Sequence, residues 1–96
     1  MQFLLIAHDG KNPDAESLRA RVRPVHLEKI SKFKKSGEFL FGGAILNDDG
    51  KMVGSMIVYD VPSRERLDEI LKDEPYIYEG VWQQIEIVPF QLANIQ

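Results

Sequence analysis

Three short stretches of the chain are apolar at successive positions, and this pattern limits the sheets that the chain can form. The stretches are Phe3-Leu4-Leu5-Ile6, Phe39-Leu40-Phe41 and Met56-Ile57-Val58. A strand with one face in water alternates apolar and polar side chains, whereas a strand that is apolar throughout has both faces covered. The sequence contains no internal repeat that would supply the second cover. We therefore expect a second copy of the chain to cover one face of the sheet.

The predicted elements follow the order β-α-β-β-α-β. The strands are predicted over residues 3–8, 38–46, 51–60 and 81–90, and the first helix over residues 15–35. Ser63 is the predicted cap of a second helix, which ends before Pro75, while Asp14 can cap the first helix and Gly37 lies at its end. This order is the split βαβ arrangement of ferredoxin-like folds. The expected fold is therefore α+β, with both helices on one face of a four-stranded antiparallel sheet.

Length and composition predict one globular domain over residues 1–96. The chain is 44% apolar and 28% charged, and its net charge is −3. The charges form no basic stripe, so we expect no nucleic-acid or anionic-lipid partner. The sequence has no cysteine, which excludes disulfides, thiolate catalysis and cysteine metal sites. The apolar N-terminus is far shorter than the ~18 residues of a membrane span, and we expect a cytoplasmic protein.

His26 is the first candidate for chemistry, because it lies on the apolar face of a predicted helix. The residues of this face recur at spacings of four, four, four and three: Leu18, Val22, His26, Ile30 and Phe33. Pro24 predicts a kink or a restart of the helix. If the helix restarts there, His26 lies in its first turn, where the helix dipole favours the neutral imidazole that can accept a proton. The alternative is a buried histidine that is bonded to a backbone carbonyl and has no catalytic role.

Gly42-Gly43 interrupts the second predicted strand. Paired glycines in a strand indicate either a bulge or close backbone packing, or else a ligand contact, and both interpretations stay open. The pair belongs to no phosphate-binding motif. The histidines and acidic residues have no spacing typical of a metal site, so we expect no metal and no cofactor. His8 is predicted to point to the opposite side of the first strand from Asp9.

Several short motifs in this order and spacing resemble the YciI-like proteins, small members of the dimeric α+β barrel group. The resemblance runs from Phe3 to Phe90 and rests on these motifs: Ala7-His8-Asp9, Arg23-Pro24-Val25-His26-Leu27, Gly42-Gly43, Gly54-Ser55, Glu74-Pro75-Tyr76, Gly80-Val81-Trp82 and Val88-Pro89-Phe90. It implies a homodimer, or a higher oligomer, whose sheets pack face to face, with a cleft in each protomer.

The resemblance also implies an enzyme with a catalytic histidine and aspartate, which correspond here to His26 and Asp9. Members usually carry Asp-Pro-Tyr or Asp-Pro-Phe after the second helix, whereas this chain has Glu74 before the proline and Asp73 before that. The role of this second acidic position, including whether it partners His26, is therefore open. One relative dehydrochlorinates a hydroxylated aromatic compound, and related dimeric barrels include lactone isomerases.

A His26–Asp9 dyad would supply acid–base catalysis, because a carboxylate fixes the tautomer of an imidazole and stabilises its charged form. No serine elbow surrounds Ser55, so we interpret this residue as a substrate hydrogen-bond donor or as a packing residue. The other predicted substrate-binding residues are Arg23, Glu74, Asp73 and Tyr76. Arg23, together with Arg21, can hold an anion or lie solvated, and Tyr76 can line a pocket or pack in the core.

Three functional classes remain when these residues are taken together with what the resemblance implies. The first is a lyase, dehydrochlorinase or isomerase that moves a proton on a small cyclic or aromatic substrate. The second is a regulatory or small-molecule-binding dimer that uses the same cleft without catalysis. The third is a cofactor-free oxygenase, which would consume oxygen where the first class would not.

Overall fold

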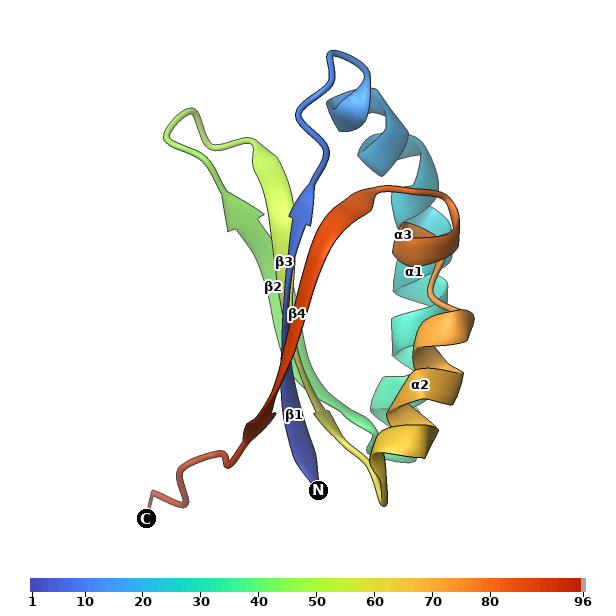
Figure 1. The fold of residues 1–96 in the computed structure, drawn as a ribbon, viewed down its shortest axis with the longest axis vertical. Coiled ribbons are helices and arrows are strands. Elements are labelled where there is room, and N and C mark those ends of the chain that lie inside the picture. The colour runs from blue at the N-terminus through green and yellow to red at the C-terminus, as the bar shows by residue number, and fades with distance from the viewer. Residues whose placement is uncertain (96) are drawn as a thin grey trace.

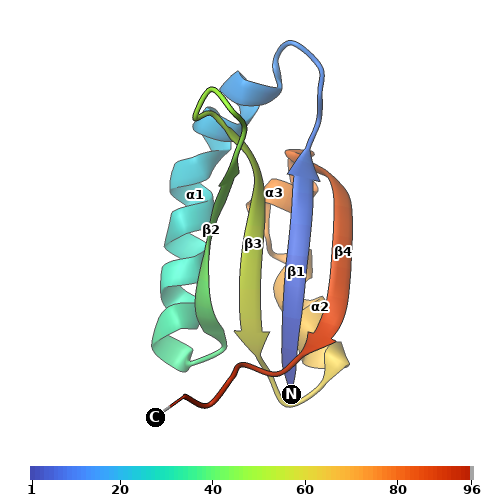
Figure 2. The same cartoon turned by 90° about the vertical axis from the view of Figure 1, so that its left-hand side faces the viewer.

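The computed structural model describes residues 1–95, and it confirms the predicted order of strands and helices. The elements are β1 (Gln2–Asp9), α1 (Ala15–Ser36), β2 (Phe39–Leu46), β3 (Met52–Asp60), α2 (Arg64–Lys72), α3 (Pro75–Tyr78) and β4 (Trp82–Phe90). The strands form one antiparallel sheet in the order β2-β3-β1-β4. All three helices lie on one face of this sheet (Figure 1), and the other face is open (Figure 2).

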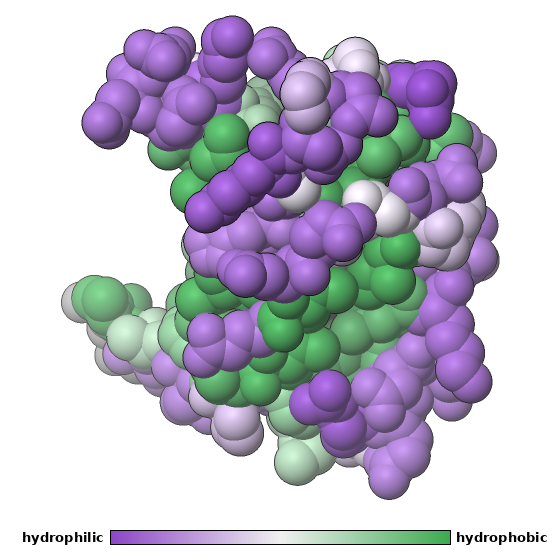
Figure 3. Space-filling view, turned by 45° about the horizontal axis from the view of Figure 1, so that its top comes forward, coloured by the Kyte–Doolittle hydropathy of each residue, from purple (hydrophilic) through white to green (hydrophobic). Residues whose placement is uncertain are grey.

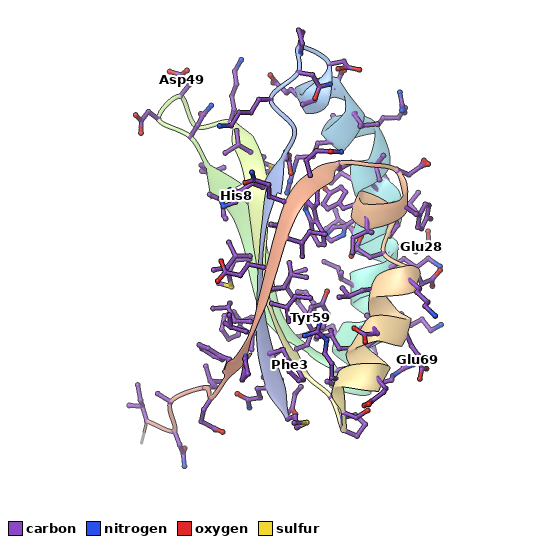
Figure 4. The ribbon with its side chains drawn as sticks, viewed as in Figure 1. Phe3, His8, Glu28, Asp49, Tyr59 and Glu69 are labelled. Atoms are coloured by element: carbon purple, nitrogen blue, oxygen red, sulfur yellow. The ribbon has the colours of Figure 1, made fainter. Side chains whose placement is uncertain are left out.

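The register of β1 assigns side chains to the two faces of the sheet. On the helix side, Phe3, Leu5 and Ala7 are buried and belong to the apolar core. The residues of β3 opposite them are Tyr59, Ile57 and Ser55. Figure 4 shows Tyr59 between the sheet and the helices and His8 toward the other side of the sheet. The predicted orientation of His8 away from the helices is confirmed, since His8 is exposed while the Asp9 side chain is buried.

Helix α1 is continuous through Pro24, so the predicted restart at this residue is wrong. The proline ring removes the backbone bond to the carbonyl of Ala20. Both residues lie on the exposed side of the helix, where water can satisfy this carbonyl. His26 therefore lies in the interior of a 22-residue helix. The predicted effect of the helix dipole on its imidazole no longer applies, because that effect is confined to the terminal turns.

Local signals set the ends of most elements. Ser63 Oγ accepts a hydrogen bond from the backbone of Arg66 at 3.1 Å, which confirms the predicted cap of α2. Gly37 ends α1 in the left-handed region with φ of 84°, a conformation that glycine adopts without strain. Asp14 stands at the start of α1 but makes no side-chain capping bond. The prediction missed α3, which follows Glu74 and begins with Pro75.

The open face of the sheet carries apolar side chains. Phe41 is 40% exposed, and Val58 and Leu4 lie beside it on the same face, as the strand registers show. The C-terminal tail crosses the lower end of this face (Figure 2), where Leu92 N donates to Gln2 Oε1 at 2.6 Å. In the space-filling view the outline on this side is hollowed between the β2–β3 hairpin and the tail (Figure 3). This face is therefore concave, and it carries exposed apolar side chains beside polar ones such as His8 and Glu86.

Candidate functional site

The inner face of α1 positions the site against the sheet. Of the predicted apolar stripe, Val22, His26 and Phe33 are buried, and Leu18 and Ile30 pack against the core. The position of His26 on the core-facing side of the helix is thus confirmed. Its imidazole is 6% exposed, so its partners decide what it can do.

The partner of His26 is Glu74. The imidazole Nδ1 lies 2.8 Å from Glu74 Oε2, and both side chains are buried. The same carboxylate oxygen accepts the backbone N–H of Tyr76 at 2.9 Å, so Glu74 also caps α3. Pro75 favours an extended backbone at the preceding residue, which is the conformation that Glu74 adopts. The Glu-Pro-Tyr motif therefore holds its acidic side chain against the histidine.

The predicted hydrogen bond between His26 and Asp9 is wrong, because Asp9 is bonded to Arg19. Nη1 of Arg19 donates to both carboxylate oxygens of Asp9, at 2.9 and 3.0 Å. Arg19 lies about two turns before His26 on α1 and therefore reaches the end of β1, while His26 reaches the start of α3. Burial raises the pKa of Asp9, although the hydrogen bond from Arg19 lowers it in part. The structure thus contains two separate buried pairs where we expected one dyad.

Ser55 connects the second pair to the sheet. Its Oγ accepts from Nη2 of Arg19 at 3.0 Å and from Nε1 of Trp82 at 3.2 Å. Ser55 is buried on β3, on the face that the helices cover. Nε of Arg19 is the fully buried side-chain nitrogen that finds no partner within residues 1–95. The guanidinium is therefore fixed by Asp9 and Ser55 through its two terminal nitrogens.

Tyr76 joins the two pairs. Its ring stacks on the imidazole of His26 at 4.0 Å between centroids, and Cζ of Arg19 lies 4.7 Å from the same ring. Trp82 contacts both aromatic rings edge-on. Burial raises the pKa of the Tyr76 hydroxyl. Tyr76, which was predicted either to line a pocket or to pack in the core, does both, since it is almost fully buried and also lines a pocket.

A pocket of about 150 Å³ lies between α1 and strands β2 and β3. Its lining comprises Arg19, Arg23, His26, Leu27, Ile30, Phe39, Gly42, Gly43, Ala44, Ser55, Ile57 and Tyr76. Within residues 1–95, Nε2 of His26 has no hydrogen-bond partner, and it is not among the fully buried polar atoms. The nitrogen opposite Glu74 therefore stays reachable from the pocket.

The close packing predicted for the glycine pair in β2 is confirmed at Gly42, and the ligand contact stays a prediction. A Cβ on Gly42 would lie 2.7 Å from the carbonyl oxygen of Met56, so close packing against β3 requires glycine there. Gly43 has open space around its Cα, and both glycines line the pocket. The missing side chains therefore leave room beside His26 as well as close strand packing.

The predicted site residues divide between the pocket and its surroundings. Arg23, Ser55 and Tyr76 line it together with His26, whereas Asp9 and Glu74 stand behind lining residues. Asp73 is exposed and bonded to Lys29 at 2.8 Å, and this hydrogen bond lowers the pKa of Asp73. Asp73 is therefore not the partner of His26.

Arg19 is the residue that the sequence analysis missed. It is 5% exposed and touches Asp9, Ser55 and Tyr76. A signal was present, because Arg19 precedes His26 by seven residues and so shares its helix face. A charged residue on an apolar stripe indicates a buried partner, in the same way as the histidine.

Two further features are absent from residues 1–95. In this part of the chain no three His, Asp or Glu side chains gather closely enough to hold a metal ion. No helix in the described residues has the length and apolar composition needed to cross a membrane.

Comparison with known proteins places the chain in a family. Residues 1–91 match the model of a family described as the YCII-related domain. Two relatives described as Protein YciI, from Escherichia coli O6:H1 and from Shigella flexneri, are each 27% identical over 97 residues, which cover 95% of this chain and 97% of the relative. These matches agree with the resemblance that the motifs indicated.

Two solved structures share the fold. One is a 5-chloro-2-hydroxyhydroquinone dehydrochlorinase from Burkholderia phenoliruptrix AC1100 in complex with 2,5-dihydroxybenzoquinone, with a TM-score of 0.82 and 20% identity over 97% of this chain and 96% of that one. The other is an antibiotic biosynthesis monooxygenase, with a TM-score of 0.53 and 17% identity over 96% of this chain and 99% of that one. At these identities the likeness shows the ferredoxin-like fold.

Proposed function

This chain belongs to the YCII-related family, and from the geometry of the His26 pocket we propose that it is a small-molecule enzyme that works by general acid–base catalysis. The reaction is of the lyase, dehydrochlorinase or isomerase type, in which a proton leaves or joins carbon. The observation that carries the proposal is the bond from His26 Nδ1 to Glu74, which leaves Nε2 without a partner among residues 1–95 on a side chain that lines the pocket.

In this proposal His26 is the base, and Glu74 orients its imidazole through the bond to Nδ1. A carboxylate only accepts hydrogen bonds, so Nδ1 carries the proton and the lone pair lies on Nε2. Nε2 then takes a proton from the substrate, and Glu74 stabilises the imidazolium that forms. Asp9 contributes through Arg19, as a positioning residue for the polar side of the pocket. This arrangement replaces the direct dyad that the sequence suggested.

The pocket favours a ring-sized substrate. A cavity of about 150 Å³ is large enough for one benzene ring. The dehydrochlorinase that shares this fold was solved with a dihydroxybenzoquinone and acts on a chlorinated hydroxyhydroquinone. Both compounds are single rings that carry oxygen substituents. A small cyclic or aromatic compound therefore fits the pocket and the proposed chemistry.

The proposed function also includes a homodimer as the working form of the protein. Phe41 on the open face of the sheet is 40% exposed, and a second copy packed face to face would remove its side chain from water. We place the working protein in the cytoplasm as a homodimer with a small-molecule substrate. The proton transfer needs only His26, its carboxylate and the substrate.

The test uses the two histidines of the chain as a matched pair. A panel of chlorinated and hydroxylated hydroquinones and small lactones is screened for turnover with the wild type, His26→Asn and His8→Asn. A general base contributes about 10²–10⁴-fold in rate, so His26→Asn should lose that factor while His8→Asn keeps the wild-type rate. His8 lies on the other face of the sheet and controls for the loss of an imidazole.

Three results would overturn the assignment. A substrate whose turnover is unchanged in His26→Asn would remove His26 as the base. Tight binding of these rings with no turnover of any would make the protein a binding module instead. Oxygen consumption during turnover would place it with the oxygenases.

A further inference from the structure

The hydrogen bonds of Ser55 determine where its own proton can go. A serine hydroxyl has two acceptor positions and one O–H donor. Guanidinium and indole N–H groups can only donate, so the bonds from Arg19 and Trp82 occupy both acceptor positions of Oγ. Within residues 1–95, no protein oxygen accepts a hydrogen bond from Ser55. The O–H is therefore left to a group in the pocket, which Ser55 helps to line.

The side chains that flank Ser55 in the sheet are small. In the sheet it is flanked by Ala7 on β1 and Ala44 on β2, which are its direct cross-strand partners on the same face. Side chains opposite each other in a sheet pack in contact, so large residues at these positions would cover the hydroxyl. Ala44 and the adjacent Gly42 line the pocket beside it.

The charges around Ser55 favour an anionic acceptor. The Arg19 guanidinium that donates to Oγ is buried, and a donor on Oγ makes the O–H a stronger donor itself. Arg23, also on α1, lines the same pocket. Asp9 neutralises part of the charge of Arg19, but it lies outside the pocket lining. The Glu74 carboxylate, which is bonded to His26, also lies outside the lining, so the lining residues Arg19, Arg23 and Ser55 present hydrogen-bond donors to the pocket.

We propose that Ser55 donates a hydrogen bond to a ligand oxygen that is anionic or becomes so, which makes the substrate class phenols and enols of one ring. Arg19 and Trp82 are positioning residues that fix the direction of this hydroxyl. The proposal rests on the proposed function in one respect, because it places the ligand in the same pocket as His26. A base at Nε2 and a donor at the oxygen would together stabilise the enolate that proton abstraction from carbon creates.

The probe is 4-nitrophenol, whose ionised form is recognised by its absorbance. Binding is titrated at pH values on both sides of the ionisation of the free probe, with wild type, Ser55→Ala, Ser55→Thr and Arg21→Met. We expect the wild type to prefer the phenolate, so that bound probe ionises at a lower pH than free probe. Ser55→Ala should bind the phenolate about 10-fold or more weakly, because a hydrogen bond to a charged group is lost.

The other variants separate this role from a structural one. Ser55→Thr keeps the hydroxyl and should restore the phenolate preference. Arg21 is exposed on the same helix and does not line the pocket, so Arg21→Met should match the wild type. Binding of toluene, a neutral ring, should be unchanged in Ser55→Ala, which shows that the pocket stays folded.

Three results would overturn the proposal. They are the absence of 4-nitrophenol binding by the wild type, equal binding of the neutral and ionised forms, and unchanged phenolate binding in Ser55→Ala. The titration measures binding without turnover, and all of its variants keep His26. Failure of the binding experiment therefore leaves the proposal of proton transfer by His26 standing. Failure of the turnover experiment leaves the proposal of phenolate binding by Ser55 standing.

Discussion

Two buried pairs position the side chains around the pocket, His26 with Glu74 and Arg19 with Asp9. Removing one member of a buried ion pair such as Arg19–Asp9 typically costs about 3–5 kcal/mol, because the other charge is left without a partner. Residues in such pairs are therefore held firmly in place. For His26 the consequence is chemical, since the carboxylate decides which ring nitrogen carries the proton.

The first prediction is that Glu74→Gln lowers the catalytic rate. Glu74→Gln keeps an oxygen that can accept the Tyr76 N–H, so α3 should remain folded. The amide no longer enforces the tautomer or stabilises the imidazolium, and kcat should fall by about 10²–10⁴-fold. The neighbouring Asp73→Asn should keep nearly the wild-type kcat, because Asp73 is bonded to Lys29 on the surface. Equal losses in the two variants, measured by steady-state kinetics, would contradict the assignment.

The partner of His26 marks the limit of what the sequence could predict at this scale. The stripe on α1 revealed His26, because helical periodicity is local. Glu74 lies 48 residues away from His26 in sequence, and no periodicity connects the two. Asp9 and Glu74 were both acidic candidates, and only the register of Arg19 on α1 shows that Asp9 is already engaged.

The elements were predicted well where a local signal marks their ends. Ser63 and Gly37 fix helix ends by capping and by backbone conformation, and both act within a few residues. The short helix α3 was missed because four residues cannot show a helical period. Pro24 gave the wrong signal, since its exposed position lets the helix continue past the lost bond. Local rules therefore predicted where elements begin and end better than whether a helix continues without a break.

A second prediction concerns the contact between α2 and the sheet. Arg66 holds Glu38, just before β2, through two hydrogen bonds at 2.6 and 3.0 Å. The bond from Arg66 lowers the pKa of Glu38 below its ordinary 4.5. A depressed carboxyl pKa gives stability that is present above the unfolded value and lost as pH falls through the folded value. Glu38→Gln should therefore lower the free energy of unfolding by about 0.5–1 kcal/mol at pH 7, with allowance for solvent screening.

The pH dependence distinguishes the ion pair from packing. In urea denaturation, the gap between the wild type and Glu38→Gln should be constant above pH 5 and should close as the pH falls below 4.5, the ordinary pKa of this carboxyl. Arg64→Met can serve as a control, because Arg64 lies on the same helix and pairs with Asp68 on the surface. A gap that persists unchanged into acid would show that the pair does not stabilise the fold.

The whole molecule leaves one apolar face without a cover. The chain buries the helix side of its sheet, yet Phe41 is 40% exposed on the other side. Contiguous exposed apolar patches on soluble proteins mark interaction surfaces. The apolar runs in the sequence predicted this two-sided sheet, and a single chain cannot reveal the partner. We predict that the partner is a second copy.

The third prediction tests that interface with two residues of nearly equal exposure, Phe41 and Val25. Phe41→Lys places a charge on the open face and should shift the protein toward the monomer in light scattering, with dimer dissociation at least about 10-fold easier. Val25→Lys places the same charge on α1, where Val25 is 42% exposed, and should leave the dimer intact. A monomeric wild type at micromolar concentration, or equal effects of the two changes, would contradict a dimer through this face.

The most direct measurement on the central claim is the tautomer of His26. Two-bond nitrogen–proton NMR spectra report which ring nitrogen carries the proton, and the chain has only two histidines to assign. The account predicts that neutral His26 is protonated at Nδ1, with a free lone pair on Nε2, and that Glu74→Gln shifts its tautomer while His8 is unaffected. Asp9→Asn should leave the His26 signals in place. A proton on Nε2 in the wild type, or a shift caused by Asp9→Asn alone, would contradict Glu74 as the residue that prepares His26 as a base.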